Sequence, residues 1–439
     1  MAVVRVATGI ACVIALSWNA TSHEEVEYSL SGAEAIKVVA DDPAGEPAPL
    51  TRPGRTLRRP QLTDGQRAAI RRAGPALMLF AAVRLTGVAM LTGWALRIGR
   101  HPSTVLGLEW DSKWYWRIAE HGYGVVRVHG SHGSIHDDRA FFPLYPAMIH
   151  AFDAIVPVGK IDAALLIAWT GALAAAWGVF AVGDLLYGRR VGTALAVLWA
   201  VLPHAVVLTV AYTEPVMTAF AAWALYAVLT GRRLTAGGLA ALAGLCRPNG
   251  LAVAAAVVTA LTIDARQRCR AGRMVGARTW AAALLAPAGW VGYVVWVAVD
   301  KGAPTGYLQA QATWGSRFDF GHYTARILHH LIVHQGNFAN YLAAAISLAA
   351  LVLLVLCVLA GQPLPLLVYN AVLLVMALGT AHYFPSRPRL LLPAFPILLP
   401  LAVPLARARL RTAMVLLSAT AGFSLLCGVY LFGIASTAP

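Results

Sequence analysis

The apolar segment PALMLFAAVRLTGVAMLTGWALRI, residues 75–98, decides the fold class. An α-helix needs about 20 predominantly apolar residues to cross the hydrocarbon core of a bilayer, and this run is long enough. Comparable runs recur along the chain, and of its 439 residues 59% are hydrophobic and only 13% charged. Because soluble domains carry about 25% charged residues, the sequence predicts an all-α, polytopic membrane protein with about nine to eleven transmembrane helices.

Basic residues gather immediately before this segment. They are Arg52, Arg55, Arg58, Arg59, Arg67, Arg71 and Arg72. Since such residues accumulate on the cytoplasmic side, we expect the segment to run outward and the loop after it to lie on the outer face. The formal net charge of +15 then reflects cytoplasmic loops that face anionic lipid, and nucleic acid is not an implied partner.

The other basic clusters give one consistent map of further spans. The expected inward helices cover 161–187, 214–230, 337–360 and 391–406, and the outward helices cover 191–211, 279–299, 364–381 and 412–432. The proline-rich stretch FFPLYPAMIHAFDAIVP, 141–157, is expected to lie as a helix at the outer interface.

Residues 234–263 do not fit a simple span, because CRPNG at 246–250 interrupts them. Each half is too short for a hydrocarbon core of about 30 Å. This pattern predicts a re-entrant hairpin with the CRPNG motif at its buried tip. The alternative is one kinked helix.

The N-terminal part differs from the membrane domain. Residues 1–20 form a signal-like segment or follow a start placed too far upstream, and the polar residues 21–60 are typical of disorder. We therefore expect a cytoplasmic or disordered segment over 1–73 and one transmembrane domain over 74–433. The five cysteines show neither zinc nor disulfide spacing.

The first outer loop carries the motif LEWDSKWYWRIAEHGYG, residues 108–124. An aromatic belt at the membrane surface accounts for its tryptophans and tyrosines. A belt does not account for Asp111 among other ionisable groups. An ionised carboxylate at the surface can serve as general base for a hydroxyl nucleophile, whereas the alternative is an ordinary interfacial loop carboxylate.

Arginines in another outer loop, HYFPSRPR at 382–389, oppose the positive-inside bias. The planar guanidinium fork of Arg387 and Arg389 suits an anion such as phosphate. The alternative is contact with lipid headgroups. Glu214, in AYTEP at 211–215, could be a solvated helix cap, could orient a substrate hydroxyl, or could pair with Arg247.

A divalent metal is a weaker hypothesis. The candidate ligands are His129, His132, His136, Asp137 and Asp138. Their spacing matches no strong zinc signature, so a hydrated polar loop is the preferred interpretation. We expect neither a metal nor a cofactor.

Four stretches, in this order, resemble the PIG-V family of glycosylphosphatidylinositol mannosyltransferase 2-like proteins in its bacterial form. They are EWDSKWYWRIAEHGYG…AFFPLYP, LPHAVVLTVAYTEPVMTAF, CRPNG and SRPRLLLPAFPILLP. The resemblance implies a GT-C-type membrane glycosyltransferase with a large first outer loop. Such an enzyme takes a sugar, usually mannose, from a polyprenyl-phosphate donor on the outer side. The histidine-rich segment between Gly124 and Phe141 departs from the family pattern, and the family name does not identify the acceptor.

The resemblance makes Asp111 the catalytic base of an inverting transfer. It places the family's Tyr-Ser/Thr-Glu pattern at 212–214 and its Arg-x-Asn-Gly pattern at 247–250. With the polar groups of the outer loops, the residues expected to bind substrate are Trp110, Lys113, His121, Tyr123, Arg139, Tyr145, Tyr212, Glu214, Arg247, Asn249, Gln311, Trp314, Arg387 and Arg389.

The expected partners are a polyprenyl-phosphate sugar donor, a lipid or envelope-glycan acceptor, and the bilayer of a bacterial cell membrane, with the active site on the extracytoplasmic face. The rival interpretation is a transporter or lipid flippase, because discontinuous helices with charge at membrane depth also mark transporters. The sequence shows no internal repeat, and its polar groups gather at one face, which favours the enzyme. The enzyme hypothesis requires Asp111 to meet Arg387 or Arg389 in one cavity.

Overall fold

The computed structural model describes residues 64–124, 128–129 and 135–433. The predictions for residues 1–63 therefore lie outside the described residues. Within them the chain is helical, apart from a short antiparallel pair of strands, β1 (Val128–His129) and β2 (Ile135–His136). The expected all-α class is confirmed.

Six described helices are long and apolar enough to cross a membrane. They are α2 (Asp64–Arg97), α6 (Lys160–Tyr187), α10 (Gly250–Arg270), α11 (Ala277–Asp300), α14 (Phe338–Leu359) and α18 (Leu410–Gly433). Three shorter apolar helices accompany them, α8 (Glu214–Leu229), α9 (Arg233–Cys246) and α15 (Leu364–Gly379). If one bent pair of helices near the C-terminus counts as a single span, the described residues hold up to seven candidate spans, fewer than the nine to eleven expected, because the three shorter helices have only 14 to 16 residues.

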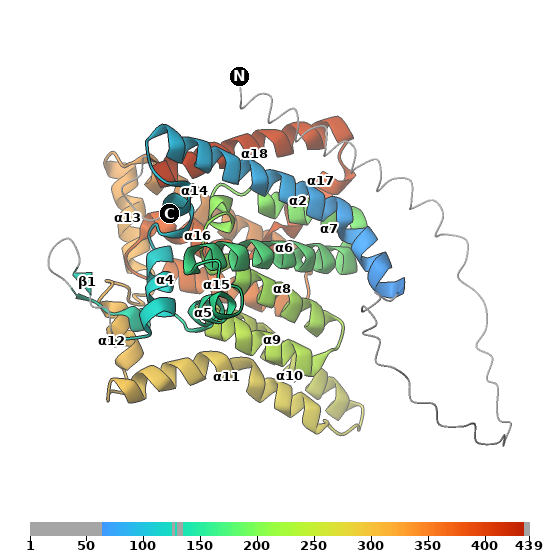
Figure 1. Cartoon of the computed structure of the whole chain (residues 1–439). Helices are drawn as coiled ribbons and strands as arrows, with labels where there is room; N and C mark the ends of the chain where they lie inside the picture. Colours follow the sequence, from blue (N-terminus) through green and yellow to red (C-terminus); the bar gives the residue numbers. More distant parts are fainter. Residues whose placement is uncertain (1–63, 125–127, 130–134, 434–439) are drawn as a thin grey trace, which may run out of the picture.

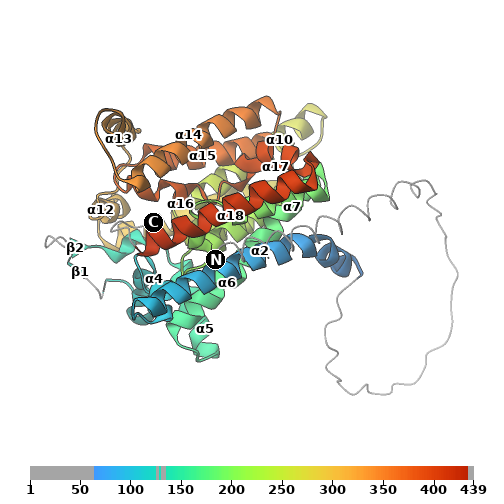
Figure 2. The same cartoon turned by 90° about the horizontal axis from the view of Figure 1, so that it is seen from above.

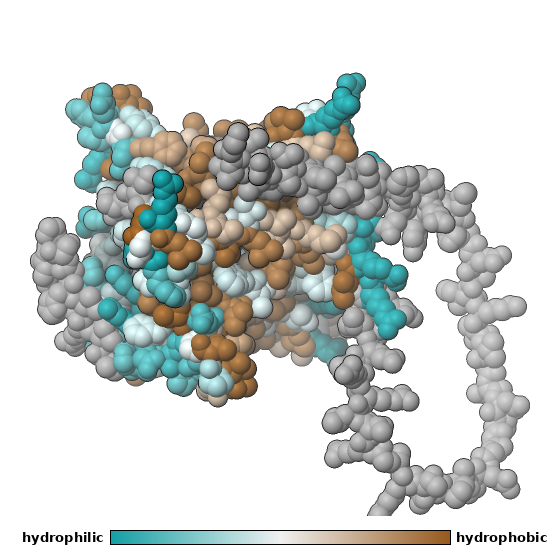
Figure 3. All heavy atoms as spheres, turned by 45° about the horizontal axis from the view of Figure 1, so that its top comes forward, coloured by the Kyte–Doolittle hydropathy of each residue, from teal (hydrophilic) through white to brown (hydrophobic). Residues whose placement is uncertain are grey.

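The long helices run roughly side by side, and the shorter elements gather at one end of them (Figures 1 and 2). At that end lie α4 (Ser112–His121), α12 (Gly306–Ala312) and α13 (His322–Val333), together with the β1–β2 pair. α2 begins at the opposite end. A hydrophobic band separates more hydrophilic surfaces at the two ends (Figure 3). The remaining helices of the first loop are α3 (Pro102–Gly107), η2 (Asp138–Ala140) and α5 (Leu144–Ile155).

The predicted outward span 191–211 is wrong. α7 (Arg189–Ala200) ends early, and a turn leads to the short η3 (Ala205–Leu208). Pro203 lacks the amide that would continue the helix. Irregular backbone at membrane depth is tolerated only where protein groups satisfy it.

Side chains from other helices supply these missing partners. The buried guanidinium of Arg84 donates to the carbonyls of Ala200 and Ala205. The indole of Trp169 donates to the carbonyl of Thr209 at 2.8 Å, and the Ser424 hydroxyl donates to the carbonyl of Leu202 at 2.6 Å. These bonds hold the polypeptide that leads into the AYTEP motif.

The predicted inward span 391–406 is also wrong as a single helix. The chain forms η4 (Phe384–Ser386), α16 (Arg387–Leu391), η5 (Phe395–Leu398) and α17 (Leu399–Arg407), with a bend of 84° between the two halves. Pro393 and Pro396 fall at the break and remove the amides that a continuous helix needs. The break leaves α16 at the level of the first loop's motif.

A helical hairpin around CRPNG is present, but the prediction that both halves are too short to span is wrong for α10, which has 21 residues and qualifies as a span. α9 and α10 lie antiparallel, because Arg233 near the start of α9 binds Asp264 near the end of α10 at 3.0 Å. Gly250 follows the tip, and a Cβ at this position would lie 2.3 Å from the carbonyl oxygen of Ala243. Only glycine permits so close a return. The hairpin thereby places Arg247 at its buried tip.

Candidate active site

Four charged residues from four separate elements meet at this tip. A guanidinium nitrogen of Arg389 forms an ion pair with Asp111 at 2.8 Å, and another lies 3.1 Å from Glu214. Arg247 forms an ion pair with the same Glu214 oxygen at 2.8 Å. We call Asp111, Glu214, Arg247 and Arg389 the charged quartet. Two carboxylates and two guanidinium groups balance one another, as buried charges must.

The four elements explain why these residues meet. Asp111 precedes α4, Glu214 opens α8, Arg247 sits between α9 and α10, and Arg389 lies on α16. Each therefore stands at a helix end or on a short helix, where the chain turns near the same membrane depth. The expected meeting of Asp111 with an arginine of the 382–389 loop is what the structure shows.

Asp111 is the open carboxylate of the charged quartet. Its side chain is 19% exposed, whereas that of Glu214 is 1% exposed. Glu214 is held between two guanidinium groups. A substrate that approaches the cluster can therefore reach Asp111, while Glu214 fixes the two arginines.

Neighbouring hydroxyls and rings orient the charged quartet. The Thr213 hydroxyl lies 2.7 Å from Arg247 and 3.1 Å from the Tyr115 hydroxyl. The guanidinium of Arg389 lies over the ring of Tyr212, 5.1 Å from its centroid, a favourable cation–π geometry. All three residues at 212–214 thus contact the arginines.

The backbone beside the cluster adopts an unusual conformation. Trp110 has φ 52°, and His382 and Tyr383 have φ 64° and 49°. Left-handed φ values are uncommon for bulky residues and persist only where the surroundings enforce them. Trp110 immediately precedes Asp111, and the other two precede α16, so the strain flanks the quartet on both sides.

An aromatic layer lies beside Asp111. Trp114 stacks on Phe141 with ring centroids 5.7 Å apart and meets Trp314 edge-on at 4.9 Å. His136 stacks on Trp314 at 4.3 Å. The layer joins the first loop to the segment after α12 with apolar faces, a surface on which a sugar ring can stack.

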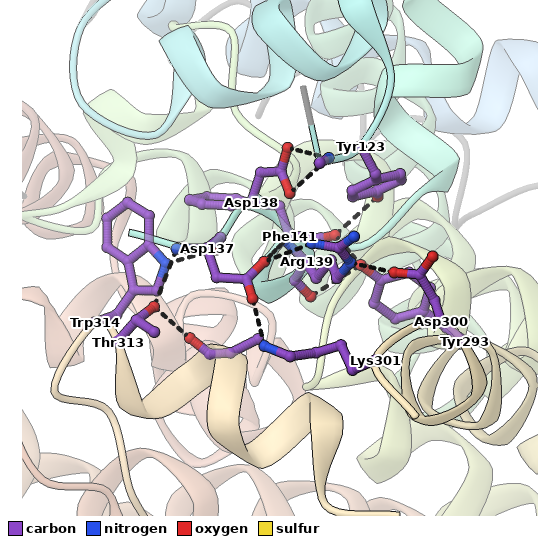
Figure 4. Close-up of polar contacts among 12 residues, drawn as sticks. Tyr123, Asp137, Asp138, Arg139, Phe141, Tyr293, Asp300, Lys301, Thr313 and Trp314 are labelled. Carbon is purple, nitrogen blue, oxygen red and sulfur yellow. Dashed lines mark hydrogen bonds and ion pairs between the residues drawn. The ribbon is translucent and has the colours of Figure 1, made fainter. Parts of the chain in front are cut away.

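Ion pairs clamp this layer in place (Figure 4). Lys301 donates to the Asp137 carboxylate at 2.6 Å, and Arg139 pairs with Asp300. The Trp314 indole donates to the carbonyl of Asp137 at 2.9 Å. The end of α11 is therefore fastened to the first loop.

The pKa values of the two neighbouring acids in this clamp move apart. Burial pushes the pKa of Asp137 up, but the Lys301 ammonium and the Arg139 amide outweigh it and hold it below the ordinary 3.8. Burial raises the pKa of Asp138 above 3.8, although the Gly124 amide opposes this. A depressed carboxyl pKa stabilises the fold above the unfolded pKa, and that stability is lost as pH falls through the folded pKa. The Asp137 clamp is thus intact at neutral pH and is lost only in acid below pH 3.8.

Asp137→Asn should release the clamp at neutral pH. The lost charge-assisted bonds to Lys301 and Arg139 correspond to about 1.5–3 kcal/mol of local stability. We expect faster amide hydrogen exchange in residues 136–141 and 311–316. Asp153→Asn, which removes a pair with Lys160, is the control and should leave these two segments unchanged. Unchanged exchange in the Asp137 variant would show that the clamp does not order the layer.

Several other predicted residues form hydrogen bonds or ring contacts that hold the first outer loop. Tyr123 donates to the carbonyl of Phe141 at 2.9 Å, and Gln311 donates to the carbonyl of Ala140 at 3.1 Å. With Arg139 and Trp314 they line or fasten the aromatic layer. Trp110 is half-buried next to Asp111.

Five predicted residues belong neither to the charged quartet nor to the aromatic layer and its ion pairs. Arg387 is buried, and its guanidinium donates to Thr324 and to the carbonyls of Leu378 and Thr380. It therefore anchors α13 and α15 and does not face Asp111. The buried hydroxyl of Tyr145 and the amide of Asn249 donate to backbone carbonyls, while Lys113 and His121 are exposed on α4.

Sequence reasoning missed several contacts. Thr213 and Tyr115 lie inside the quoted motifs, so their chemistry could have been noted, but their meeting depends on the packing of α4 against α8. Lys301 and Asp300 belong to no motif that the sequence analysis identified.

No group of three or more His, Cys, Asp and Glu side chains in the described residues is arranged to hold a metal. His132 lies outside those residues.

No protein-family model matches the sequence, and no curated protein does. Among solved structures, ArnT from Cupriavidus metallidurans bound to undecaprenyl phosphate is 14% identical with a TM-score of 0.48, and ArnT in the apo state is 13% identical with a TM-score of 0.47. Each match covers 77% of this chain but only 61% of that chain. At this level of similarity, a shared activity does not follow.

Proposed function

We propose that this protein is a membrane glycosyltransferase that transfers mannose from a polyprenyl-phosphate carrier to a glycolipid or other envelope acceptor. The observation that carries the proposal is the charged quartet, in which only Asp111 is open to a substrate. Residues 74–433 would form the catalytic domain. A lipid carrier fits this architecture, since its tail can stay in the bilayer while its polar end meets the helix termini.

The proposed reaction is an inverting transfer. Asp111 accepts the proton of an acceptor hydroxyl, and the hydroxyl oxygen attacks the anomeric carbon. The bond from that carbon to the carrier phosphate breaks, and the phosphate leaves with the electron pair. Inverting glycoside hydrolysis uses a carboxylate base in the same way. Arg389 is a positioning residue, because its ion pair fixes the Asp111 carboxylate.

The proposed face is the extracytoplasmic one. The exposed Arg71 and Arg72 lie near the start of α2, at the end opposite α4 and α12 (Figure 1). Basic residues favour the cytoplasmic side, which leaves the charged quartet at the outer end. A bacterial cell membrane is the proposed location.

A transfer assay tests the function. Membranes containing the protein would be supplied with labelled polyprenyl-phosphate mannose and, separately, polyprenyl-phosphate glucose. We expect label to appear in extracted glycolipid or polymer from the mannose donor. Movement of the carrier across the bilayer without sugar transfer would refute the enzyme hypothesis in favour of a lipid flippase. No transfer from either donor in membranes that hold suitable acceptors would refute the proposal.

A further inference from the structure

A polar hollow lies outside the charged quartet. Its volume is about 370 Å³, and its lining includes Gly315, Arg317, Asp319, Tyr323, Arg326 and His382. These residues belong to the segment between α12 and α13, to α13 itself, and to the loop before α16. α12 and α13 lie at the same end of the molecule as α4 (Figure 1), and residues on and beside them line the hollow.

The charges in the hollow favour an anion. Arg317 and Arg326 are exposed, and neither guanidinium makes a hydrogen bond or ion pair with another described residue. The carboxylate of Asp319 is occupied, since it accepts the amides of Gly321 at 3.0 Å and Tyr323 at 2.8 Å. Two open guanidinium forks within one hollow match the oxygens of a phosphate.

Two exposed aromatic residues are sequence neighbours of residues that line the hollow. Phe318 is 51% and Phe320 85% exposed, and their rings meet edge-on at 5.0 Å. Both flank Asp319 in sequence. Exposed apolar surface of this kind can serve as a contact for lipid. A ligand with an anionic head and a long apolar tail would satisfy both the arginines and these rings.

The chain links the hollow to the proposed reaction centre. Gly315 follows Trp314 of the aromatic layer, and His382 stacks on Tyr323 at 5.8 Å. The next residue, Tyr383, feels the charges of both Asp111 and Arg389, since burial and then Asp111 raise the pKa of its hydroxyl while Arg389 lowers it. His382 lines the hollow, and the chain runs from it through Tyr383 and η4 into α16, which carries Arg389.

We infer that Arg317 and Arg326 bind the phosphate of an isoprenyl-phosphate lipid in this hollow. The inference rests on the proposed function, in which that phosphate is the leaving group. Arg389 is poorly placed for this task, because its guanidinium is already held by Asp111 and Glu214. Arg387 donates to Thr324 and backbone carbonyls. Arg317 and Arg326, in contrast, line the hollow and make no hydrogen bond or ion pair with another described residue.

Lipid binding tests this inference without requiring catalysis. The full chain would be placed in nanodiscs of zwitterionic lipid, and tryptophan fluorescence would follow titration with undecaprenyl phosphate. We expect Arg317→Gln/Arg326→Gln to weaken binding at least about tenfold, since two charge-assisted contacts are lost. Arg273→Gln, an exposed arginine between α10 and α11, is the matched control and should bind as the unaltered protein does. Equal affinity in the double variant would overturn the inference.

Three further probes separate the sources of the anion. Undecaprenol tests the tail without the phosphate, inorganic phosphate tests the head without the tail, and phosphatidylglycerol tests an ordinary anionic lipid. The inference requires all three to bind at least about tenfold more weakly than undecaprenyl phosphate. Comparable affinity for any of them would overturn it.

Two controls separate folding and function from this site. Arg317→Lys/Arg326→Lys keeps both charges but removes the fork, and we expect binding between that of the unaltered protein and the glutamine variant. Asp111→Asn should bind undecaprenyl phosphate normally. Arginine-dependent binding without sugar transfer would refute the proposed function and leave the site standing. Sugar transfer together with undecaprenyl phosphate binding that is unchanged by substitution of both arginines would refute the site and leave the proposed function standing.

Discussion

Asp111→Asn is expected to abolish sugar transfer, with a loss of about 100- to 10,000-fold, the usual effect of removing a general base. Asparagine keeps the shape of the side chain and an oxygen that can still accept from Arg389. It cannot accept the proton of the acceptor hydroxyl. Because Asp111 is the open carboxylate of the charged quartet, no neighbouring acid can substitute for it. Initial rates in membranes with polyprenyl-phosphate mannose measure the effect.

The matched control is Glu109→Gln, two residues earlier. Glu109 pairs with Arg100 near the surface, and their side chains are 25% and 44% exposed. Exposed pairs of this kind contribute about 0–1 kcal/mol, so the control should transfer sugar at the rate of the unaltered protein. Both variants should be recovered in membranes in similar amounts. Transfer by the Asp111 variant within about threefold of the control would remove this residue from the chemistry.

Apolar length predicted the long helices well. α6, α11 and α14 lie within a few residues of their predicted bounds. A helix is stable in lipid when its own consecutive residues are apolar, and this can be read directly from the sequence. The same criterion failed at 191–211, which is equally apolar. There the backbone leaves the helix at Pro203, and Arg84 of α2 receives the freed carbonyls. That compensation comes from a distant helix, so the local sequence does not encode it.

The two arginines of HYFPSRPR show a similar limit within the candidate site. The sequence assigned Arg387 and Arg389 to one anion site and predicted that one of them meets Asp111; Arg389 is the one that does. Both lie in α16, and residues two positions apart on a helix point about 200° away from each other. One must therefore face away when the other faces the acid. Because this stretch was expected to be a loop, the prediction did not take into account that two arginines two positions apart on a helix face different directions.

Glu214→Gln is expected to destabilise the whole protein by about 3–5 kcal/mol, the usual effect of breaking a buried ion pair. The variant leaves Arg247 and Arg389 with Asp111 as their only remaining counter-charge within the quartet. The unbalanced positive charge is buried, since the Glu214 side chain is 1% exposed and those of the two arginines about 10%. Thermal unfolding of the purified protein in detergent, followed by circular dichroism, measures the loss.

Asp264→Asn provides the matched control, because Asp264 also contacts two arginines, Arg233 and Arg268, at 3.0 and 3.1 Å. All three of these side chains are close to 30% exposed, so water can replace the carboxylate. Exposed pairs contribute about 0–1 kcal/mol each, and the control should unfold near the temperature of the unaltered protein. At both sites one carboxylate contacts two arginines, and the sites differ mainly in how deeply these side chains are buried. Equal stability losses at both would show that water reaches the charged quartet freely, and would remove the physical basis for a reaction centre there.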